Sequence, residues 1–382
     1  MSEYLDYWRC FGEDYASARH LFLEAATAAG ADLTAYIHPD RKGPEGEALA
    51  VDVATLGPQD ASRQLLILSG THGLEGRAGS AMQVAWLLAG DGGRLPPDVR
   101  VVLVHALNPY GFAYASRTTE NNVDLNRNFV DHGAPYPDNP GYAELHHALL
   151  PPVWSEAALA ATEAATARYR QEHGPDALFD VTARGQYTHP DGVMYGGRGR
   201  EWSNLTLERI VQTHLAGARQ VGLIDWHTGI GDYGEPFFLC FNPDGSDLQA
   251  EAARWWGHER VVGQRPNGLA RPDYQGLVFN GVRQFLDGRP MVGAVIEYGT
   301  AAGPARAASR LDQWLRFVAP GQPDPRRDAI LKADVIDAMV PTSSLWRRAV
   351  IKHGLQITRQ AVAGIASWRT DDTRVGTLTG ES

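Results

Sequence analysis

The chain has 382 residues, of which 43% are hydrophobic and 21% charged, a composition typical of a water-soluble globular protein with a large core. Its 45 acidic residues outnumber its 35 basic residues, and the formal charge of −10 argues against broad nucleic-acid binding and against binding to an anionic membrane. Two cysteines cannot form a disulfide framework, no apolar run reaches the length of a membrane helix, and no signal peptide is visible. We therefore expect a cytoplasmic protein.

Buried strands and amphipathic helices alternate along the chain. Runs typical of strands cover residues 49–57, 64–70, 99–107, 221–229, 237–241 and 291–300. Helical patterns cover residues 3–30, 77–90, 154–174 and 201–216, the first of them closed by Gly30. The order strand, helix, strand favours an α/β protein with a parallel sheet.

The block from about residue 130 to 220 differs in residue pattern from the rest of the chain. It opens with a proline-rich loop at 131–142 and contains a glycine-rich loop at 185–199. Because predicted strands lie on both sides of this block, we interpret it as an insertion within a single catalytic domain that covers residues 1–382.

Chemically capable side chains follow the predicted strands, and the carboxyl ends of parallel strands are where open sheets bind ligands. His72 and Glu75 follow one strand in an HxxE spacing with glycines nearby, so the two side chains can close on one divalent ion. His227 lies near the end of another predicted strand, 221–229. Taken singly, each signal has an ordinary structural explanation. The first is then a turn histidine beside an unrelated glutamate, and the second is a hydrogen-bonded histidine in a strand.

Polar residues crowd the segment 108–129, which follows the strand at 99–107. Arg117, Asn126 and Arg127 offer guanidinium and amide groups that can hold a carboxylate or a developing oxyanion, although a solvated loop has the same composition. Asp124 in the same segment can accept a hydrogen bond from a ligand histidine.

Glu297 emerges at the end of the apolar strand MVGAVIEYGT. Apolar surroundings raise the pKa of a carboxyl group, which suits a general base near neutral pH, whereas a structural ion pair is the alternative. Four strand ends carry such groups: two with possible metal ligands, one with groups that can bind an oxyanion, and one with a possible base. This combination is improbable by chance.

In this order, the segments SGTHGLEG, ENNVDLNRNF, DWHTG and EYGT resemble the zinc carboxypeptidase superfamily and, within it, a bacterial branch known only as a domain of unknown function. The resemblance covers residues 45–310, most of the chain. It implies a three-layer α/β/α sandwich around a mixed, mostly parallel sheet of about eight strands.

The resemblance also implies one zinc ion per chain, bound by His72, Glu75 and His227. It implies that Glu297 is the general base and proton shuttle and that Arg117 polarises the scissile carbonyl.

By the same resemblance, Asn126 and Arg127 hold the free carboxylate of the substrate, and Asp124 is the hydrogen-bonding partner of the zinc ligand His72. Tyr110 stands where the family carries aspartate, which affects loop packing more than catalysis. Tyr274 is the residue that could stand for the mobile tyrosine of the digestive enzymes, although its surroundings differ.

These residues predict a zinc-dependent hydrolase of C–N bonds next to a free carboxylate, and first a carboxypeptidase that acts on small peptides. The alternative is an N-acyl amino acid deacylase, because the aspartoacylase-like branch shares the ligand arrangement. A metal-free binding module is a third reading, which the complete set of ligands and base disfavours. The amino-acid sequence leaves side-chain preference and oligomeric state open.

Overall fold

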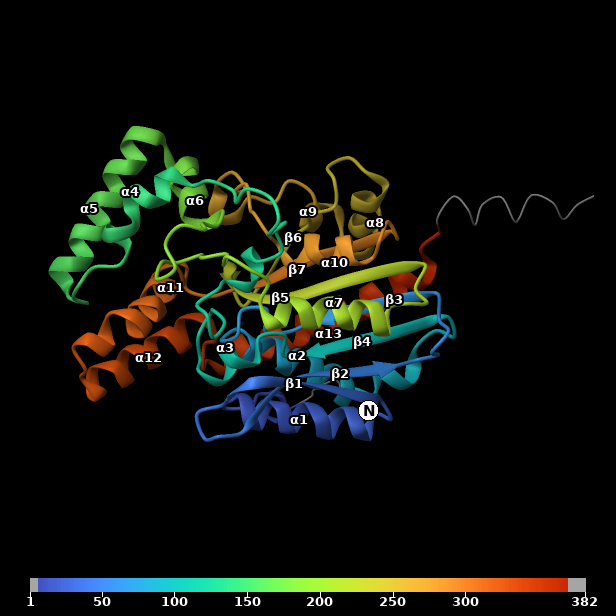
Figure 1. The fold of residues 1–382 in the computed structure, drawn as a ribbon. Helices are drawn as coiled ribbons and strands as arrows, with labels where there is room; N and C mark the ends of the chain where they lie inside the picture. The colour runs from blue at the N-terminus through green and yellow to red at the C-terminus, as the bar shows by residue number, and fades with distance from the viewer. Residues whose placement is uncertain (1–5, 370–382) are drawn as a thin grey trace, which may run out of the picture.

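The computed structural model describes residues 6–369, and these are organised around one mixed sheet (Figure 1). Its strands are β1 (Asp32–Lys42), β2 (Ala48–Leu56), β3 (Arg63–Leu68), β4 (Val99–His105), β5 (Gln220–Tyr233), β6 (Pro236–Leu239) and β7 (Met291–Gly299). They lie in the order β1-β2-β4-β3-β5-β7-β6. The described part of the chain thus holds seven strands, near the eight predicted.

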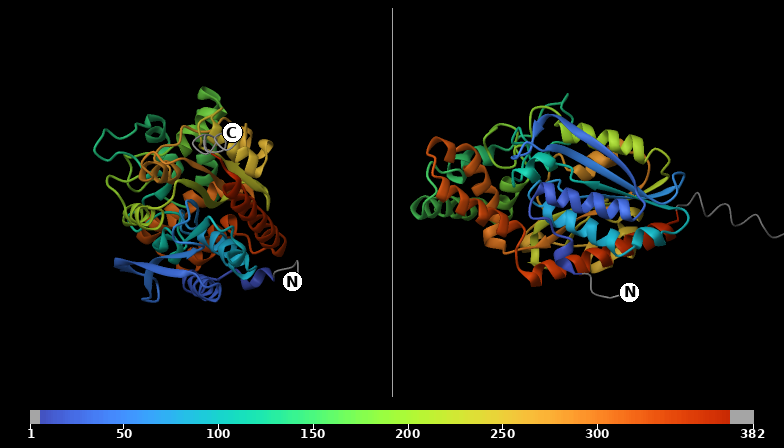
Figure 2. Two further views of the ribbon diagram at one scale, coloured as in Figure 1. Left: turned by 90° about the vertical axis from the view of Figure 1, so that its right-hand side faces the viewer. Right: turned by 90° about the horizontal axis from the view of Figure 1, so that it is seen from below.

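The four central strands, β4, β3, β5 and β7, are parallel, and β2 and β6 run antiparallel to their neighbours at the two sides. The predicted strands are confirmed, but the sequence did not indicate β1, which pairs with β2 in antiparallel orientation. β1 is exposed along most of its length and contains Pro39, so it lacks the apolar run of a buried strand. Figure 2 shows the β1–β2 pair projecting from the body of the molecule.

Helices cover both faces of the sheet and complete the predicted three layers. One face packs against α1 (Tyr15–Ala28), α2 (Gly76–Leu88), α8 (Asp247–Trp256) and α13 (Ser344–Ser367), and the other face packs against α7 (Trp202–His214) and α10 (Val278–Phe285). The central strands alternate between the two cores: Leu65 and Ile67 face one, and Leu66 and Leu68 face the other. A strand buried on both faces reads as continuously apolar, which is why the sequence revealed it.

The N-terminal helix is shorter than predicted. Instead of covering 3–30, helix α1 begins at Tyr15, because the side chain of Asp14 caps it by accepting from the backbone N–H of Ser17 at 2.8 Å. A short 3₁₀ turn, η1 (Tyr7–Arg9), precedes it, and residues 3–5 lie outside the described part of the chain. Gly30 follows the helix with φ +73°, the left-handed conformation expected of a terminating glycine.

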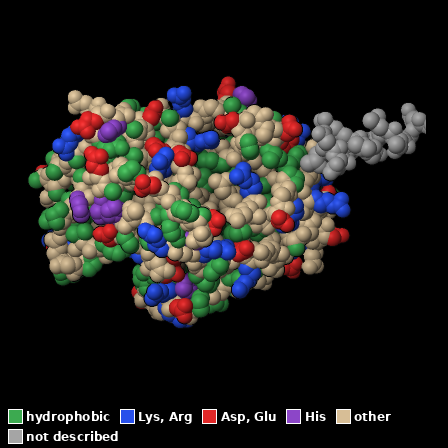
Figure 3. All heavy atoms as spheres, turned by 45° about the horizontal axis from the view of Figure 1, so that its top comes forward, with side chains coloured by type: hydrophobic (Ala, Val, Ile, Leu, Met, Phe, Trp, Pro, Cys, Tyr) green, Lys and Arg blue, Asp and Glu red, His purple; other side chains and the backbone are tan. Residues whose placement is uncertain are grey.

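A group of helices lies beyond the carboxyl ends of the parallel strands. Between β4 and β5, after α3 (Pro109–Ala113) and η3 (Leu125–Arg127), the chain forms α4 (Pro140–Leu149), α5 (Glu156–His173) and α6 (Pro175–Ala183), which have their own small apolar cluster. The pair α11 (Ala302–Phe317) and α12 (Pro325–Met339) lies below them in Figure 1. In Figure 3 this end of the molecule projects from the body beside a notch, and acidic and basic side chains are interspersed over the visible face.

The remaining described helical turns are short: η2 (Asp91–Arg94), α9 (His258–Val261), η4 (Pro266–Gly268) and η5 (Ala319–Gly321). Across residues 6–369, every helix falls short of the combination of length and apolarity that crossing a membrane requires.

Candidate metal centre and its cavity

The loop between β3 and α2 carries His72 and Glu75 to the carboxyl edge of the sheet. It packs directly on the loop that follows β4: a Cβ atom on Gly73 would lie only 2.1 Å from the backbone of Gly111. The backbone N–H of Gly73 also donates to the carbonyl of Arg117 at 3.2 Å. The close approach of two loops therefore needs glycine at this position, and it brings Arg117 beside the HxxE pair.

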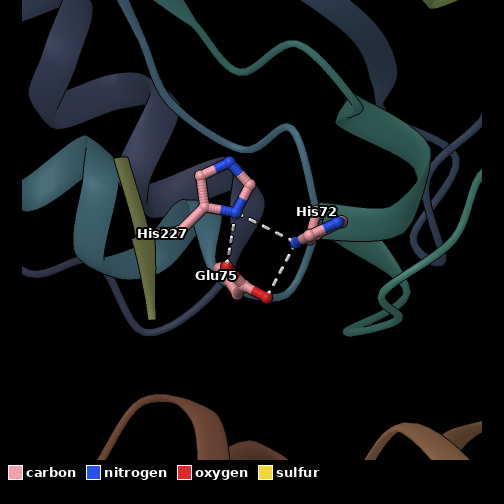
Figure 4. Close-up of side chains that lie close together, drawn as sticks. All are labelled: His72, Glu75 and His227. Atoms are coloured by element: carbon pink, nitrogen blue, oxygen red, sulfur yellow. Dashed lines mark hydrogen bonds and ion pairs between the residues drawn. The ribbon is translucent and has the colours of Figure 1, made fainter. Parts of the chain in front are cut away.

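Three side chains from two distant parts of the sequence converge at this edge (Figure 4). The Nδ1 atoms of His72 and His227 lie 3.1 Å apart, and each faces one oxygen of Glu75, at 3.0 Å for His72 and 3.2 Å for His227. All three side chains are buried, with exposures of 4% or less. Within residues 6–369, the ligand atoms of these three residues lie close enough together to hold a metal ion.

The donor set suits zinc in both chemistry and spacing. Two imidazole nitrogens and one carboxylate leave the fourth position of a tetrahedral ion open, as in catalytic zinc sites. Zinc–ligand bonds of about 2.1 Å in tetrahedral geometry separate donor atoms by about 3.4 Å. The separations of 3.0–3.2 Å among the three donors are close to that value.

A carboxylate that the sequence analysis missed lies beside His227. Asp225 Oδ2 lies 2.9 Å from His227 Nε2, and Asp225 Oδ1 accepts a hydrogen bond from Thr71 Oγ1 at 2.8 Å. Ligand histidines commonly present their second nitrogen to a carboxylate, which orients the ring. A signal was available in the sequence, because Asp225 and His227 are two residues apart in a strand and so share one face.

His72 has a different environment on its second nitrogen. Its Nε2 lies 3.2 Å from Asp124 Oδ1 and 2.8 Å from a terminal nitrogen of Arg117. Arg117 also donates to Asp124 at 3.0 Å and to Glu75 at 3.3 Å. The guanidinium of Arg117 is thus engaged with the candidate ligands and with Asp124.

The charges of this cluster shift the acidity of its members. Burial opposes ionisation of Glu75, but the neighbouring His72 and His227 hold the pKa of its carboxyl below the usual range. Burial likewise opposes ionisation of Asp124, and the charge of Arg117 keeps the pKa of Asp124 well below its ordinary value. Both carboxyl groups are therefore ionised at neutral pH, as a cation site requires.

Glu297 stands beside the ligand group. It is the register partner of His227 on the neighbouring strand β7, so both side chains leave the same face of the sheet. Burial raises the pKa of Glu297 to about 7, against the opposing influence of His227. Its Oε2 accepts a hydrogen bond from the backbone N–H of Ile230 at 3.4 Å.

Asn126 and Arg127 follow Asp124 on the turn η3. Asn126 Oδ1 accepts from the backbone N–H of Val278 at 2.8 Å, which leaves its amide nitrogen for other partners. Arg127 donates from Nε and one terminal nitrogen to the carbonyl of Ala183, at 3.0 and 2.7 Å, and its guanidinium lies 5.0 Å from the ring centroid of Tyr274.

A cavity of about 340 Å³ extends from this cluster into the space between the projecting helices. Its volume lies within the range of small-molecule sites. Apolar side chains from α4, α6 and the loop 185–199 form much of its wall, so the region between β4 and β5 supplies a part of the cavity. Most of the residues singled out from the sequence line it: His72, Arg117, Asn126, Arg127, Tyr274 and Glu297.

Fold and site together define an α/β/α protein with a buried candidate metal centre at the carboxyl edge of its sheet. Similar solved structures include metallo-carboxypeptidases from Burkholderia cenocepacia (15% identity over 94% of this chain and 71% of the other, TM-score 0.43) and Pseudomonas aeruginosa (14%, 88% and 68%, 0.41). A succinylglutamate desuccinylase from Chromobacterium violaceum aligns at 15% identity over 85% of this chain and 74% of the other, with a TM-score of 0.35. Because these similarities are remote, the functional proposal stands on the geometry of the site.

The chain belongs to the family described as "Protein of unknown function (DUF2817)", which matches residues 11–353. The motifs predicted membership of such a branch, and the family match confirms it. No curated protein matches the chain.

Proposed function

We propose that this protein is a zinc-dependent hydrolase that cleaves a peptide or amide C–N bond next to a free carboxylate. One observation carries the proposal: two imidazole nitrogens and a carboxylate converge within 3.0–3.2 Å of one another, beside the buried carboxyl group of Glu297. The first candidate activity is that of a carboxypeptidase-type metallopeptidase.

Zinc held by His72, Glu75 and His227 would supply Lewis-acid chemistry, which acidifies water and polarises a carbonyl group. Glu297 then has the task of a general base. Because burial raises its pKa to about 7, the carboxyl group can take a proton from the attacking water and return it to the leaving amine near neutral pH.

Arg117 is the candidate for stabilising the oxyanion. If His72 binds the metal ion through Nδ1, its ring proton lies on Nε2, where Asp124 accepts a hydrogen bond. Arg117 then loses its acceptor on that nitrogen, and since it lines the cavity, its N–H becomes available to the carbonyl oxygen of a substrate. A well-placed donor of this kind contributes roughly 3 kcal/mol to transition-state stabilisation.

Asn126 and Arg127 are the candidates for holding the carboxylate of the substrate. Within residues 6–369, hydrogen bonds to Ala183 and to the carbonyl of Asn126 occupy three N–H groups of Arg127. An arginine has five such groups, and those left over can bind a carboxylate in the cavity in charge-assisted hydrogen bonds. This contact would align the C–N bond with the metal and the base.

The size of the cavity is also compatible with a second candidate, an N-acyl amino acid deacylase. A cavity of about 340 Å³ lies at the small end of the range found for small-molecule sites. Such a space accommodates a terminal residue of a peptide, and equally a whole small acylated amino acid.

Metal analysis and a substrate panel test the proposal. We expect about one zinc per chain, lost in His72→Ala and retained in a control, His258→Ala, on the exposed surface. The panel contains peptides with a free or amidated C-terminus and N-acyl amino acids. Cleavage restricted to free-acid peptides supports the peptidase, and cleavage restricted to N-acyl amino acids supports the deacylase. A protein without stoichiometric metal or turnover would favour a binding module.

A further inference from the structure

Helix α11 carries a buried carboxylate that the proposed reaction does not use. The side chain of Asp312 is 3% exposed. Its Oδ2 accepts hydrogen bonds from Ser116 Oγ at 2.7 Å and from the backbone N–H of Arg117 at 2.9 Å. Its Oδ1 lies 3.1 Å from Nζ of Lys332 on the neighbouring helix α12 (Figure 1). Asp312 therefore holds the backbone of the residue whose guanidinium reaches the candidate metal centre.

The charged neighbours of Asp312 bind the same loop. Lys332 Nζ also donates to the carbonyl of Ala115 at 2.8 Å, and Arg316, one turn after Asp312, donates to the carbonyl of Thr119 at 3.1 Å. Apolar side chains of both helices lie in the large core, so the packing of α11 on α12 does not depend on an ion pair. Removing an ion pair from water is costly, and its presence is weak evidence of a contribution to stability. What these charged groups share is the loop after β4 that they hold.

The loop needs such support, because its backbone is strained. Ala115 has φ +48°, a left-handed conformation that costs a residue other than glycine about 1–2 kcal/mol. Such a conformation persists where the surrounding contacts hold it. Both backbone groups of Arg117 are engaged, since its N–H donates to Asp312 and its carbonyl accepts from the N–H of Gly73 at 3.2 Å. Arg117 is thus held between α11 and the HxxE loop, and with Asp312 and Glu75 it lines one small cavity of about 10 Å³.

We propose that Asp312 is a positioning residue, which holds the backbone of Arg117 so that the guanidinium reaches the candidate metal centre. Within residues 6–369, the side-chain hydrogen bonds of Asp312 end at Ser116, Arg117 and Lys332, so none reaches a candidate metal ligand. Asp312 therefore acts through Arg117. Its role in catalysis rests on the proposed function, whereas the placement of the guanidinium can be measured without turnover.

A double-mutant cycle tests the role in catalysis. Asp312→Asn keeps the shape of the side chain but removes its charge, and we expect kcat to fall by about 10- to 100-fold with the zinc content unchanged. In an Arg117→Ala background the same substitution should change kcat by less than about twofold, because residues that act through one another are not additive. Asp334→Asn, exposed on α12, is the matched control and should leave kcat unchanged in both backgrounds.

Lys332→Met approaches the same loop from α12 and serves as the second variant if Asp312→Asn does not fold. We expect a smaller loss of kcat, about three- to tenfold, which also disappears in the Arg117→Ala background. An equal loss in both backgrounds would overturn the proposal, because the side chains would then act through a residue other than Arg117. An unchanged kcat in Asp312→Asn would overturn it as well.

Nuclear magnetic resonance on the full-length chain gives the readout without turnover. The Nε–H of Arg117 donates to Asp124 at 3.0 Å, and its resonance is identified by its absence in Arg117→Lys. We expect this resonance to shift or disappear in Asp312→Asn and to stay in place in Asp334→Asn. If it responds in this way but no peptide or N-acyl amino acid is cleaved, the proposed hydrolase fails and the positioning role stands. If substrates are cleaved but Asp312→Asn alters neither the resonance nor kcat, the positioning role fails and the hydrolase stands.

Discussion

Two buried histidines on opposite faces of the same sheet show what separates a candidate metal centre from a structural core. His227 lies toward the carboxyl end of β5 and faces the core with α7 and α10, whereas His105 ends β4 and packs toward α1 and α2. Their exposures are 1% and 0%. By place in the fold and by burial, the two residues are nearly equivalent.

Their neighbours differ. His105 stacks on Phe22, with ring centroids 4.5 Å apart, and its Nε2 lies 2.9 Å from Ser80 Oγ. Its register partner Asp52 is engaged by Arg19 at 2.6 and 3.0 Å. Burial accordingly lowers the pKa of His105 to about 4, so this imidazole is neutral at physiological pH.

Burial acts in the same direction on His227, but Asp225 and Glu75 reverse it and raise the pKa of His227 well above its ordinary value. The rise reports a negative local field, which favours a positive charge at this place; a metal ion would have to displace the proton, because a histidine ligand is neutral. The difference is that Asp225 and Glu75 lie against the ring of His227, whereas the carboxylate nearest His105 in register, Asp52, is engaged by Arg19. Substitutions around the two rings can test this difference.

The largest effect is expected at the base beside His227. Glu297→Gln keeps the shape of the side chain but removes its ability to accept a proton, so turnover should fall by about 10²- to 10⁴-fold while the zinc content is unchanged. Steady-state kinetics and metal analysis on the same preparation measure both quantities. Glu235→Gln is the control, because Glu235 is exposed at the turn before β6. Undiminished turnover in Glu297→Gln would remove Glu297 from the mechanism.

The second prediction concerns the pH dependence of stability at His105. In the unfolded chain this histidine binds a proton below its ordinary pKa of 6.5, but in the folded chain only below about 4. Its contribution to stability is therefore fully present above pH 6.5 and is lost as the pH falls toward 4, a change of about 3 kcal/mol. Urea unfolding between pH 4 and 7 should show this slope in the wild-type protein and a smaller slope in His105→Gln.

The comparison at each pH is between the variant and the wild type, so a uniform loss of stability in His105→Gln does not affect the test. His258→Gln, at an exposed position, should keep the wild-type slope. If His105→Gln keeps it as well, the pKa of His105 does not change on folding and the contrast with His227 is lost.

Much of the fold was predictable, because the central strands are buried on both faces and therefore read as continuous apolar runs. The strand around Leu66 is an example, with residues alternating between two cores. The HxxE pair was visible for a similar reason, since both ligands lie in one short loop. The edge strand β1 was not predictable, because an exposed strand lacks the apolar pattern that identifies a buried one.

Which residues from different strands meet in the site was harder to predict. That His227 meets His72 depends on β3 and β5 being neighbours, which is a fact of topology rather than of local sequence. Asp225 could have been found, since a carboxylate within VGLIDWHTG is unusual in a strand that is otherwise apolar.

Asp225 also provides the smallest and most specific test of the contrast between the two histidines. Asp225→Asn keeps the shape of the side chain, whose Oδ2 lies 2.9 Å from His227 Nε2, but removes the charge. If the carboxylate is what turns a buried imidazole into a ligand, zinc affinity should fall by about 10- to 100-fold, measured by competition with a chromogenic chelator. Asp232→Asn, exposed on the same strand, should leave the affinity unchanged. An unaltered affinity in Asp225→Asn would mean that His227 is positioned by the strand alone, and the carboxylate would then be no more than a buried partner for Thr71.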